Sequence, residues 1–339
     1  MRCLVVGGTG FLGGAITDGL LAAGHDVSIL SRGETRRSIP GEAITIQADR
    51  YGVLDHLRQH RFEWVFDTCA YTPKAVENLL LALGDQVQRY VMISSISAYG
   101  AFAKARLDET ENVPTATEDD LAFARALPAK DRASAAAYGV AYGRLKRSCE
   151  ITAQDILGTG ATSLRVGLLI GAGDYSDRLT AWVRRIDLAQ GELCQIPAPR
   201  PENARVQLID VRDVADFALL CCKGELHGVW NVTSEATSMA EVLSTIHQVT
   251  RSDAHFVWVD PQTITKTGLR PWVDVPLMIP DASEFTHFMN VSTDKARAAG
   301  LKNRPLTKTL TPLLKWDRGR RNIALKAGIT PAQENMLLS

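Results

Sequence analysis

Residues 3–13 read Cys-Leu-Val-Val-Gly-Gly-Thr-Gly-Phe-Leu-Gly, and this stretch decides the fold. A short apolar run passes directly into glycines at positions 7, 10 and 13. Apolar residues then recur at Ile16, Leu20 and Leu21, which is the spacing of one helix face. The sequence therefore predicts a buried strand, a glycine turn and a helix in immediate succession.

The three glycines each have a physical reason. Gly7 permits the tight turn out of the strand, Gly10 lets the backbone approach a pyrophosphate, and Gly13 lets the helix pack closely on the sheet. Free N–H groups and the positive end of the helix dipole then face the phosphates. This order of elements is typical of a dinucleotide-binding cradle. The residues expected to form it are Gly7, Thr9, Gly10, Phe11, Leu12 and Gly13.

Length and composition limit the remaining choices. The chain has 339 residues, so we expect one large domain and a smaller lobe. Lys and Arg number 38, as do Asp and Glu, and this balance disfavours nucleic acid or an anionic membrane as the main partner. The six cysteines lack metal-ligand spacing, so we expect reduced core thiols and no metal. With no signal peptide or membrane-spanning run, we expect a cytoplasmic protein with a small-molecule partner, a homodimer being left open.

Apolar runs alternate with helical patterns over the first half of the chain. Strands are expected at 2–6, 26–31, 43–47, 63–68, 89–94 and 162–169, and helices near 12–23, 53–59, 73–83 and 138–157. Such alternation is typical of a Rossmann-type α/β fold, a doubly wound parallel sheet covered on both faces. We assign 1–170 to this domain, expect 205–235 to rejoin it, and assign 171–204 and 236–339 to a smaller, irregular C-terminal substrate lobe.

A second motif, Tyr142-Gly-Arg-Leu-Lys146, lies on the last of these expected helices. Residues four apart share a helix face, so the phenol and the ammonium can point into one site. The phenol of a tyrosine ordinarily has a pKa of about 10, and a nearby cation lowers that pKa because it favours the phenolate. Tyr142 is thus a candidate general acid or base for a carbonyl and alcohol pair. Tyr138, eight residues before Lys146, is expected to pack or to line the site entrance.

The segment Ile93-Ser-Ser-Ile-Ser-Ala-Tyr-Gly100 ends the expected fifth strand. Ligands of open α/β sheets bind outside the carboxyl ends of the strands, so a serine hydroxyl here can donate to a substrate oxygen. A hydroxyl that bonds its own backbone is the alternative for any single serine.

These three motifs, in this order, resemble the extended short-chain dehydrogenase/reductase superfamily, and in particular its NAD-dependent epimerase/dehydratase family. The resemblance covers residues 1 to about 235 and implies the catalytic set Ser95, Tyr142 and Lys146. Ser95 is preferred to Ser94 because it lies four residues before Tyr99. The resemblance implies an NAD(P)-dependent oxidoreductase that transfers a hydride at a hydroxyl or ketone carbon of a small molecule or sugar derivative.

Cofactor choice depends on Ser31 and Arg32, which end the second expected strand. A carboxylate there would bind the ribose hydroxyls, whereas an arginine can pair with a 2′-phosphate. The sequence favours NADP, with NAD as the alternative, and Arg36 and Arg37 add positive charge. The resemblance further implies adenine contacts and a cofactor-lining loop, which fall on Asp49, Arg50, Cys69, Ala70 and Tyr71.

Two departures from the family pattern matter. The interval from Gly100 to Tyr142 is longer than usual, and the insertion 101–137 suits either a lid or a surface helical hairpin, of which we expect the hairpin. Sugar dehydratases of the family have an acidic pair where this chain has Ile96-Ser97-Ala98, which disfavours dehydration.

Substrate residues are expected in loops and in the second lobe, at Tyr175, Arg178 and Arg205, with Tyr71, Trp182, Trp272 and His287 as further candidates. The two arginines suit an anionic substrate such as a nucleotide diphosphate. Three functions remain: an NADP-dependent reductase or dehydrogenase, a nucleotide-sugar epimerase with a retained NAD, and a non-catalytic dinucleotide- or RNA-binding relative. The intact catalytic set and the neutral net charge disfavour a non-catalytic dinucleotide- or RNA-binding relative.

Overall fold

The computed structural model describes residues 1–34, 41–190 and 194–339. Within these residues a sheet of seven strands has the order β11-β6-β5-β4-β1-β2-β3, and every neighbouring pair is parallel. The predicted Rossmann-type fold is therefore confirmed. The strands are β1 (Arg2–Val6), β2 (Asp26–Ser31), β3 (Ile44–Gln47), β4 (Trp64–Asp67), β5 (Arg89–Ser95), β6 (Ala161–Val166) and β11 (Gly228–Val232).

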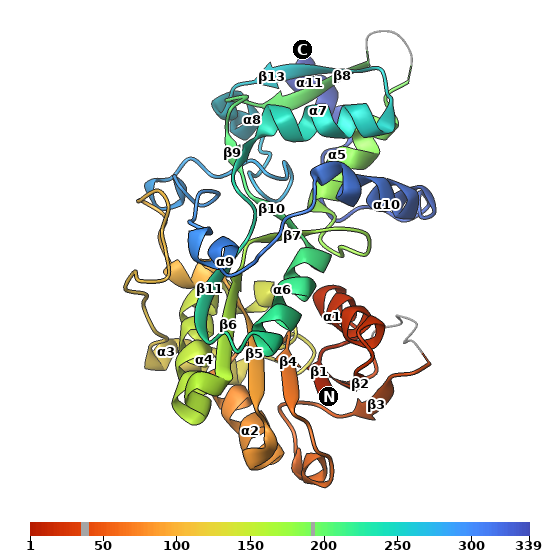
Figure 1. The fold of residues 1–339 in the computed structure, drawn as a ribbon. Coiled ribbons are helices and arrows are strands. Elements are labelled where there is room, and N and C mark those ends of the chain that lie inside the picture. Colours follow the sequence, from red (N-terminus) through yellow and green to blue (C-terminus); the bar gives the residue numbers. More distant parts are fainter. Residues whose placement is uncertain (35–40, 191–193) are drawn as a thin grey trace.

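Helices cover both faces of this sheet (Figure 1). On one face α1 (Phe11–Ala22) packs beside α6 (Val211–Lys223). On the other face α2 (Pro73–Leu83) packs beside α4 (Tyr142–Leu157), and α3 (Glu118–Ala126) lies against α4. Both faces are thus buried, which explains the continuous apolar runs of the strands.

The first strand shows how this double burial arises. Cys3 and Val5 join the core that includes α1 and α6, whereas Leu4 and Val6 join the core that includes α2 and α4. Alternate residues of a strand point to opposite faces, so one uninterrupted apolar run serves two cores.

Three expected elements take a different form. The expected strand 162–169 is divided into β6 and β7 (Leu168–Ile170), because β7 leaves the sheet to pair with β10 (Leu208–Asp210). The α-helix expected at 138–157 begins only at Tyr142, since Gly139, at a φ of 49°, interrupts the preceding 3-10 turns. The helix expected at 53–59 is a 3-10 helix over Asp55–Gln59.

The second lobe lies above the sheet in Figure 1 and has its own apolar core, which includes Ile186, Ile196, Leu243 and Leu313. Its elements are α5 (Arg178–Asp187), β8 (Cys194–Pro199), β9 (Arg205–Val206), β12 (Thr237–Ser238), α7 (Met239–Thr250), β13 (Ala254–Val259), α8 (Pro261–Lys266), α9 (Asp294–Ala298), α10 (Leu306–Arg318) and α11 (Pro331–Leu338). Strand β8 pairs with β13 and β9 pairs with β12, while α9 returns to pack on β11.

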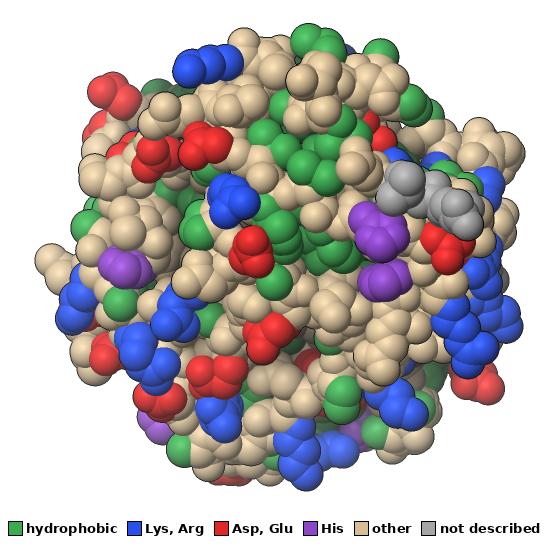
Figure 2. All heavy atoms as spheres, turned by 90° about the horizontal axis from the view of Figure 1, so that it is seen from above, with side chains coloured by type: hydrophobic (Ala, Val, Ile, Leu, Met, Phe, Trp, Pro, Cys, Tyr) green, Lys and Arg blue, Asp and Glu red, His purple; other side chains and the backbone are tan. Residues whose placement is uncertain are grey.

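Figure 2, which looks down on this lobe, shows hydrophobic side chains near the centre of the face and both basic and acidic side chains around them.

Candidate functional site

A cleft of about 440 Å³ lies between the carboxyl edge of the sheet and the second lobe. The glycine loop, the ends of β2 and β5, the start of α4 and the loop before α5 all contribute to its walls. Ligands of doubly wound sheets bind at this edge. The cleft is lined by the following predicted site residues: Gly7, Thr9, Gly10, Phe11, Leu12, Gly13, Ser31, Arg32, Asp49, Arg50, Cys69, Tyr71, Ser95, Tyr142, Lys146, Tyr175 and Arg178.

Ala70 and Arg205 do not line this cleft, and neither do three of the further candidates, Trp182, Trp272 and His287. Ala70 is fully buried in the core that includes α2 and α4. Arg205 is exposed on β9, where it pairs with Ser238 of β12. The structure therefore does not bring Arg205 together with Arg178, and the roles of Ala70 and Arg205 stay predictions.

The glycine loop leaves space for a phosphate group close to its backbone. A Cβ added to Gly13 would lie 2.1 Å from the Gly7 carbonyl oxygen, so the turn and the helix touch directly. The Gly10 N–H donates to the same Gly7 oxygen at 2.9 Å and tightens the turn. Side chains larger than hydrogen cannot occupy this contact, which fits the cradle expected for a pyrophosphate.

Buried polar atoms at the cleft also fit a dinucleotide. The Ser31 hydroxyl and the Nε and Nη2 atoms of Arg50 are buried and have no hydrogen-bond partner among the described residues. Leaving such a group unpaired costs about 1–3 kcal/mol, so a ligand rich in acceptors is favoured here. Ribose hydroxyls, phosphates and adenine all supply acceptors.

The third nitrogen of Arg50 is held by a buried carboxylate. Arg50 Nη1 lies 2.5 Å from Asp67 Oδ1, and Asp67 also accepts from the Tyr90 hydroxyl at 2.7 Å. Sequence reasoning missed Asp67 and Tyr90, although a single acidic residue at the end of the apolar run Trp64–Asp67 was an available signal.

Arg32 extends from the end of β2 along the cleft. Its Nη1 donates to the Ala129 carbonyl at 3.0 Å, and its Nη2 pairs with Glu34 at 2.6 Å. Arg36 and Arg37 lie outside the described residues. The positive charge expected for a 2′-phosphate is present at this end of the cleft, with one carboxylate already beside it.

Ser95 and Tyr142 meet where α4 begins. A Cβ on Gly143 would lie 2.0 Å from the Ser97 carbonyl oxygen, so only glycine lets the helix approach the end of β5 this closely. Burial raises the pKa of Tyr142, and a hydrogen bond with the Ser95 side chain partly offsets that effect. Tyr142 is thus held as the protonated phenol, opposite to the direction expected from the Lys146 charge alone.

Lys146 lies one helical turn farther along α4. Its Nζ donates to the Ile93 carbonyl at 2.7 Å and lies 4.6 Å from the centre of the Tyr71 ring and 5.8 Å from that of Tyr142. Burial lowers the pKa of Lys146. The hydrogen bond to the Ile93 carbonyl thus places Lys146 Nζ beside both phenols in the cleft.

Two residues near the predicted catalytic set, Ser94 and Tyr138, form hydrogen bonds with other residues. The Ser94 hydroxyl donates to Glu150 at 2.6 Å. Tyr138 is 1% exposed, its hydroxyl donates to the Arg132 carbonyl at 2.9 Å, and its ring stacks on Tyr71. Packing, one of the two roles expected for Tyr138, is confirmed.

The first residue of α5, Arg178, brings a cation to the lobe side of the cleft. The Arg178 guanidinium lies 5.0 Å from the centre of the Trp272 ring, and its side chain makes no hydrogen bond or ion pair with the described part of the chain. Tyr175 is 67% exposed and borders the same space. Arg178 is thus a positive charge over an aromatic face that forms no ion pair in the described residues, although the Asp174 carboxylate lies close enough to interact with it, and this arrangement suits an anionic group.

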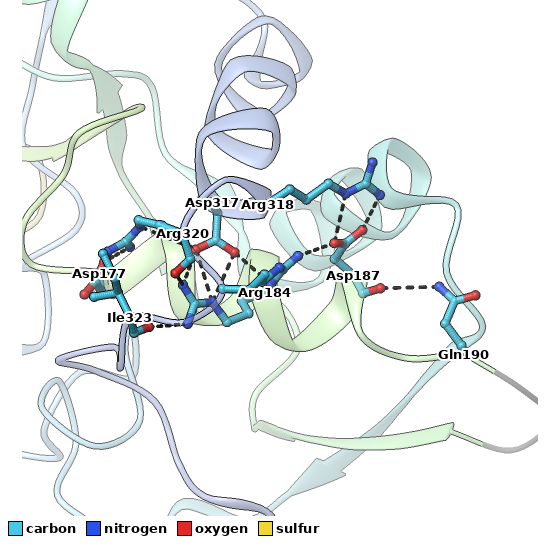
Figure 3. Close-up of polar contacts among 9 residues, drawn as sticks. Asp177, Arg184, Asp187, Gln190, Asp317, Arg318, Arg320 and Ile323 are labelled. Carbon is cyan, nitrogen blue, oxygen red and sulfur yellow. Dashed lines mark hydrogen bonds and ion pairs between the residues drawn. The ribbon is translucent and has the colours of Figure 1, made fainter.

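A network of arginines and aspartates connects the loop before α5, and α5 itself, to residues 317–326 (Figure 3). Asp177 pairs with Arg320 and accepts from the Lys326 backbone N–H at 3.1 Å. Arg184 of α5 binds Asp317 at 2.6 Å, so residues 317–326 brace both the loop and the helix that carry Tyr175 and Arg178. The partners lie far apart in sequence, and sequence reasoning missed them.

Comparison with known proteins agrees with this architecture. The sequence model of the NAD dependent epimerase/dehydratase family matches residues 63–233, just over half of the chain. A search of curated proteins found no match.

No helix in the described residues is long and apolar enough to cross a membrane.

Solved structures share the fold over nearly their whole length. A putative epimerase from Burkholderia cenocepacia J2315 is 21% identical with a TM-score of 0.66, and 94% of this chain and 98% of that chain are covered. UDP-glucose 4-epimerase from Thermotoga maritima, solved with UDP-glucose, is 17% identical with a TM-score of 0.65 and coverage of 94% and 99%. UDP-N-acetylglucosamine 4-epimerase from Bacillus cereus is 18% identical with a TM-score of 0.64 and coverage of 94% and 100%. Since the family match spans half of the sequence, the chain belongs to the NAD-dependent epimerase/dehydratase family of short-chain dehydrogenase/reductase enzymes.

Proposed function

We propose that the protein transfers a hydride at a hydroxyl or ketone carbon of a small molecule or sugar derivative, as an NAD(P)-dependent oxidoreductase. The observation that carries this proposal is the meeting of Ser95, Tyr142 and Lys146 in the cleft beside the glycine loop. The dinucleotide, when bound, supplies or accepts the hydride, so the protein must move the matching proton. This convergence also argues against a non-catalytic relative.

Tyr142 is the proton donor in reduction and the proton acceptor in oxidation. Its buried, protonated phenol suits donation to a carbonyl oxygen. Ser95 accepts the Ser97 N–H at 3.1 Å, which orients its hydroxyl toward the same oxygen. Lys146, fixed on the Ile93 carbonyl, orients the nicotinamide ribose and keeps a positive charge near the phenol.

The cofactor would lie along the carboxyl edge of the sheet. The glycine loop would hold the pyrophosphate, and the ends of β2 and β3 would hold the adenosine. The loop after β4 would line the nicotinamide half. The residues assigned to these contacts are Gly7, Thr9, Gly10, Phe11, Leu12, Gly13, Ser31, Arg32, Asp49, Arg50, Cys69 and Tyr71.

NADP is the proposed cofactor, with NAD as the alternative. Arg32 supports NADP because an arginine at the end of β2 can pair with the 2′-phosphate. Glu34 opposes it, since its carboxylate already pairs with Arg32 at 2.6 Å. Titration of NADP and NAD into wild type, Arg32→Ala and Glu34→Gln tests this balance. Arg32→Ala should lose the NADP preference and Glu34→Gln should increase it; equal preferences in wild type and Arg32→Ala would overturn the choice.

We also propose that segments 171–204 and 236–339 form the substrate lobe. Arg178, over the Trp272 ring and with no ion pair in the described residues, supports a substrate with an anionic group. The same feature favours the second candidate function, a nucleotide-sugar epimerase with a retained NAD, because a nucleotide diphosphate is such an anion. Similar structures include epimerases solved with UDP-glucose or UDP-N-acetylmuramic acid.

One experiment separates these two functions. A reductase releases oxidised cofactor in each cycle, so NADPH absorbance falls in proportion to product when a carbonyl substrate is supplied. An epimerase regenerates its cofactor and consumes none. Mass spectrometry of the supernatant from denatured protein, followed by a carbonyl and nucleotide-sugar panel, reads out both features. Retained NAD with sugar interconversion at constant NADPH would overturn the reductase proposal.

A further inference from the structure

The insertion 101–137 is anchored at one end to the catalytic helix. Arg144 of α4 donates to both carboxylate oxygens of Asp120 on α3, at 2.6 and 2.7 Å. The Ala116 N–H donates to the Ser148 hydroxyl at 3.0 Å. Only one α-helix forms in this insertion, all of which is described, so the expected helical hairpin is wrong. The acidic, Thr117-capped start of α3 explains why that part alone is an α-helix.

The other end of the insertion reaches the cofactor cleft. Arg132, Ala133 and Ala135 line the cleft. The Ala129 carbonyl accepts from Arg32, which lies 97 residues earlier at the end of β2. The segment 127–135 therefore borders the end of the cleft where adenosine is proposed to lie.

Arg132 is held rigidly at this border. Its Nε donates to the Leu127 carbonyl at 2.9 Å and its Nη2 to the Arg125 carbonyl at 3.2 Å. Its guanidinium lies 5.3 Å from the centre of the Tyr51 ring, just after β3. No acidic side chain in the described ranges forms an ion pair with Arg132, so its charge is uncompensated and pre-positioned.

The charges around Arg32 indicate a role for the second arginine, Arg132. A 2′-phosphate carries more than one negative charge, whereas Arg32 already shares its charge with Glu34. A phosphate bound at Arg32 alone would face that carboxylate. A second guanidinium that lines the same cleft without an ion pair, that of Arg132, offsets the repulsion.

We propose that Arg132 is a further cofactor-binding residue, which contacts the 2′-phosphate end of the adenosine together with Arg32, and that segment 127–135 forms the wall of that pocket. This inference rests on the proposed NADP cofactor. It assigns the insertion to cofactor recognition, while its anchor on α4 ties that wall to the helix of Tyr142 and Lys146.

The probes are 2′,5′-ADP and 5′-AMP, which lack nicotinamide and differ only in the 2′-phosphate. Calorimetric titration of Arg132→Ala should show 2′,5′-ADP affinity reduced by at least ~10-fold, the scale of a lost charge-assisted hydrogen bond. Affinity for 5′-AMP should change by less than ~3-fold. Lys130→Ala is the matched control, because Lys130 is exposed in the same segment and does not line the cleft.

Unchanged 2′,5′-ADP affinity in Arg132→Ala, or an equal loss for both probes, would overturn the inference. Wild type that binds 5′-AMP as tightly as 2′,5′-ADP would overturn the proposed NADP preference, and the inference with it. Hydrogen exchange on wild type guards against a misfolded variant. Amides of 127–135 should become more protected with 2′,5′-ADP than with 5′-AMP, and equal protection would contradict the proposed wall.

Discussion

Arg165 and Glu150 form a two-point ion pair between β6 and α4. Arg165 Nε lies 2.9 Å from Glu150 Oε1, and Nη2 lies 2.7 Å from Oε2. Both side chains are buried, and Glu150 also accepts from Ser94 on β5. Glu150 thus fixes the helix that carries Tyr142 to β6 through Arg165, and to the strand that carries Ser95 through Ser94.

Glu150→Gln should strongly destabilise the fold. The substitution leaves the Arg165 charge buried without its carboxylate, which costs about 3–5 kcal/mol. Urea unfolding followed by circular dichroism measures the change. Glu77→Gln, which breaks the exposed Lys74 pair, is the control and should cost less than about 1 kcal/mol. Similar small losses in both variants would contradict the prediction.

Tyr142→Phe should reduce turnover at least ~10²-fold, because it removes the proton donor and leaves the ring in place. Steady-state kinetics with the substrate found by the carbonyl panel measures the loss. Tyr138→Phe removes a buried hydroxyl four residues away that bonds Arg132 and Tyr51. That control should keep turnover within ~3-fold of wild type while losing about 1 kcal/mol of stability. Near-normal turnover in Tyr142→Phe would refute its role.

The pH dependence of the two reaction directions should differ. Burial raises the pKa of Tyr142, so the protonated donor persists well above neutral pH. The reduction rate should stay level from pH 6 to about 9, whereas the oxidation rate, which needs the phenolate, should rise with pH throughout that range. Plots of kcat/KM against pH in both directions check this. An oxidation rate already constant at pH 7 would show that the phenol is deprotonated there.

Gly13→Ala should abolish dinucleotide binding, since the new Cβ would overlap the Gly7 carbonyl and push the turn away from α1. Gly19→Ala lies on the same helix, where a Cβ meets only Leu219 at 3.7 Å, and should keep binding while stabilising the helix by up to about 1 kcal/mol. Calorimetric titration of NADP and NAD into both variants, with thermal unfolding, distinguishes them. Retained binding in Gly13→Ala would contradict the cradle.

Local patterns made much of the fold and the cleft predictable. The glycine turn and the Tyr142 to Lys146 spacing each lie within one or two elements, so their geometry follows from strand and helix periods. The cleft brings these predicted residues together with Ser95. The core of the second lobe could not be predicted in this way, because it draws on segments far apart in the chain, from Ile170 to Leu337.

Interactions between distant segments could not be predicted in the same way. Asp67 lies at the end of an apolar run, and only the fold shows that Arg50 pairs with it. The sequence predicted a 2′-phosphate as the partner of Arg32, but in the structure Arg32 also donates to the Ala129 carbonyl of the insertion. Arg205 shared the charge of Arg178 but falls on β9, outside the cleft.

The path of the chain between its two parts limits how the protein can be divided. The chain leaves the sheet after β6, returns for α6 and β11, departs again at β12, and comes back once more when α9 packs on β11. A single proteolytic nick between Val232 and Thr237 would therefore leave both pieces interlocked by packing. Exchange of the second lobe between related proteins would require several simultaneous splice points. New substrate preferences in this architecture are therefore easier to obtain by point substitutions around Arg178 than by recombination.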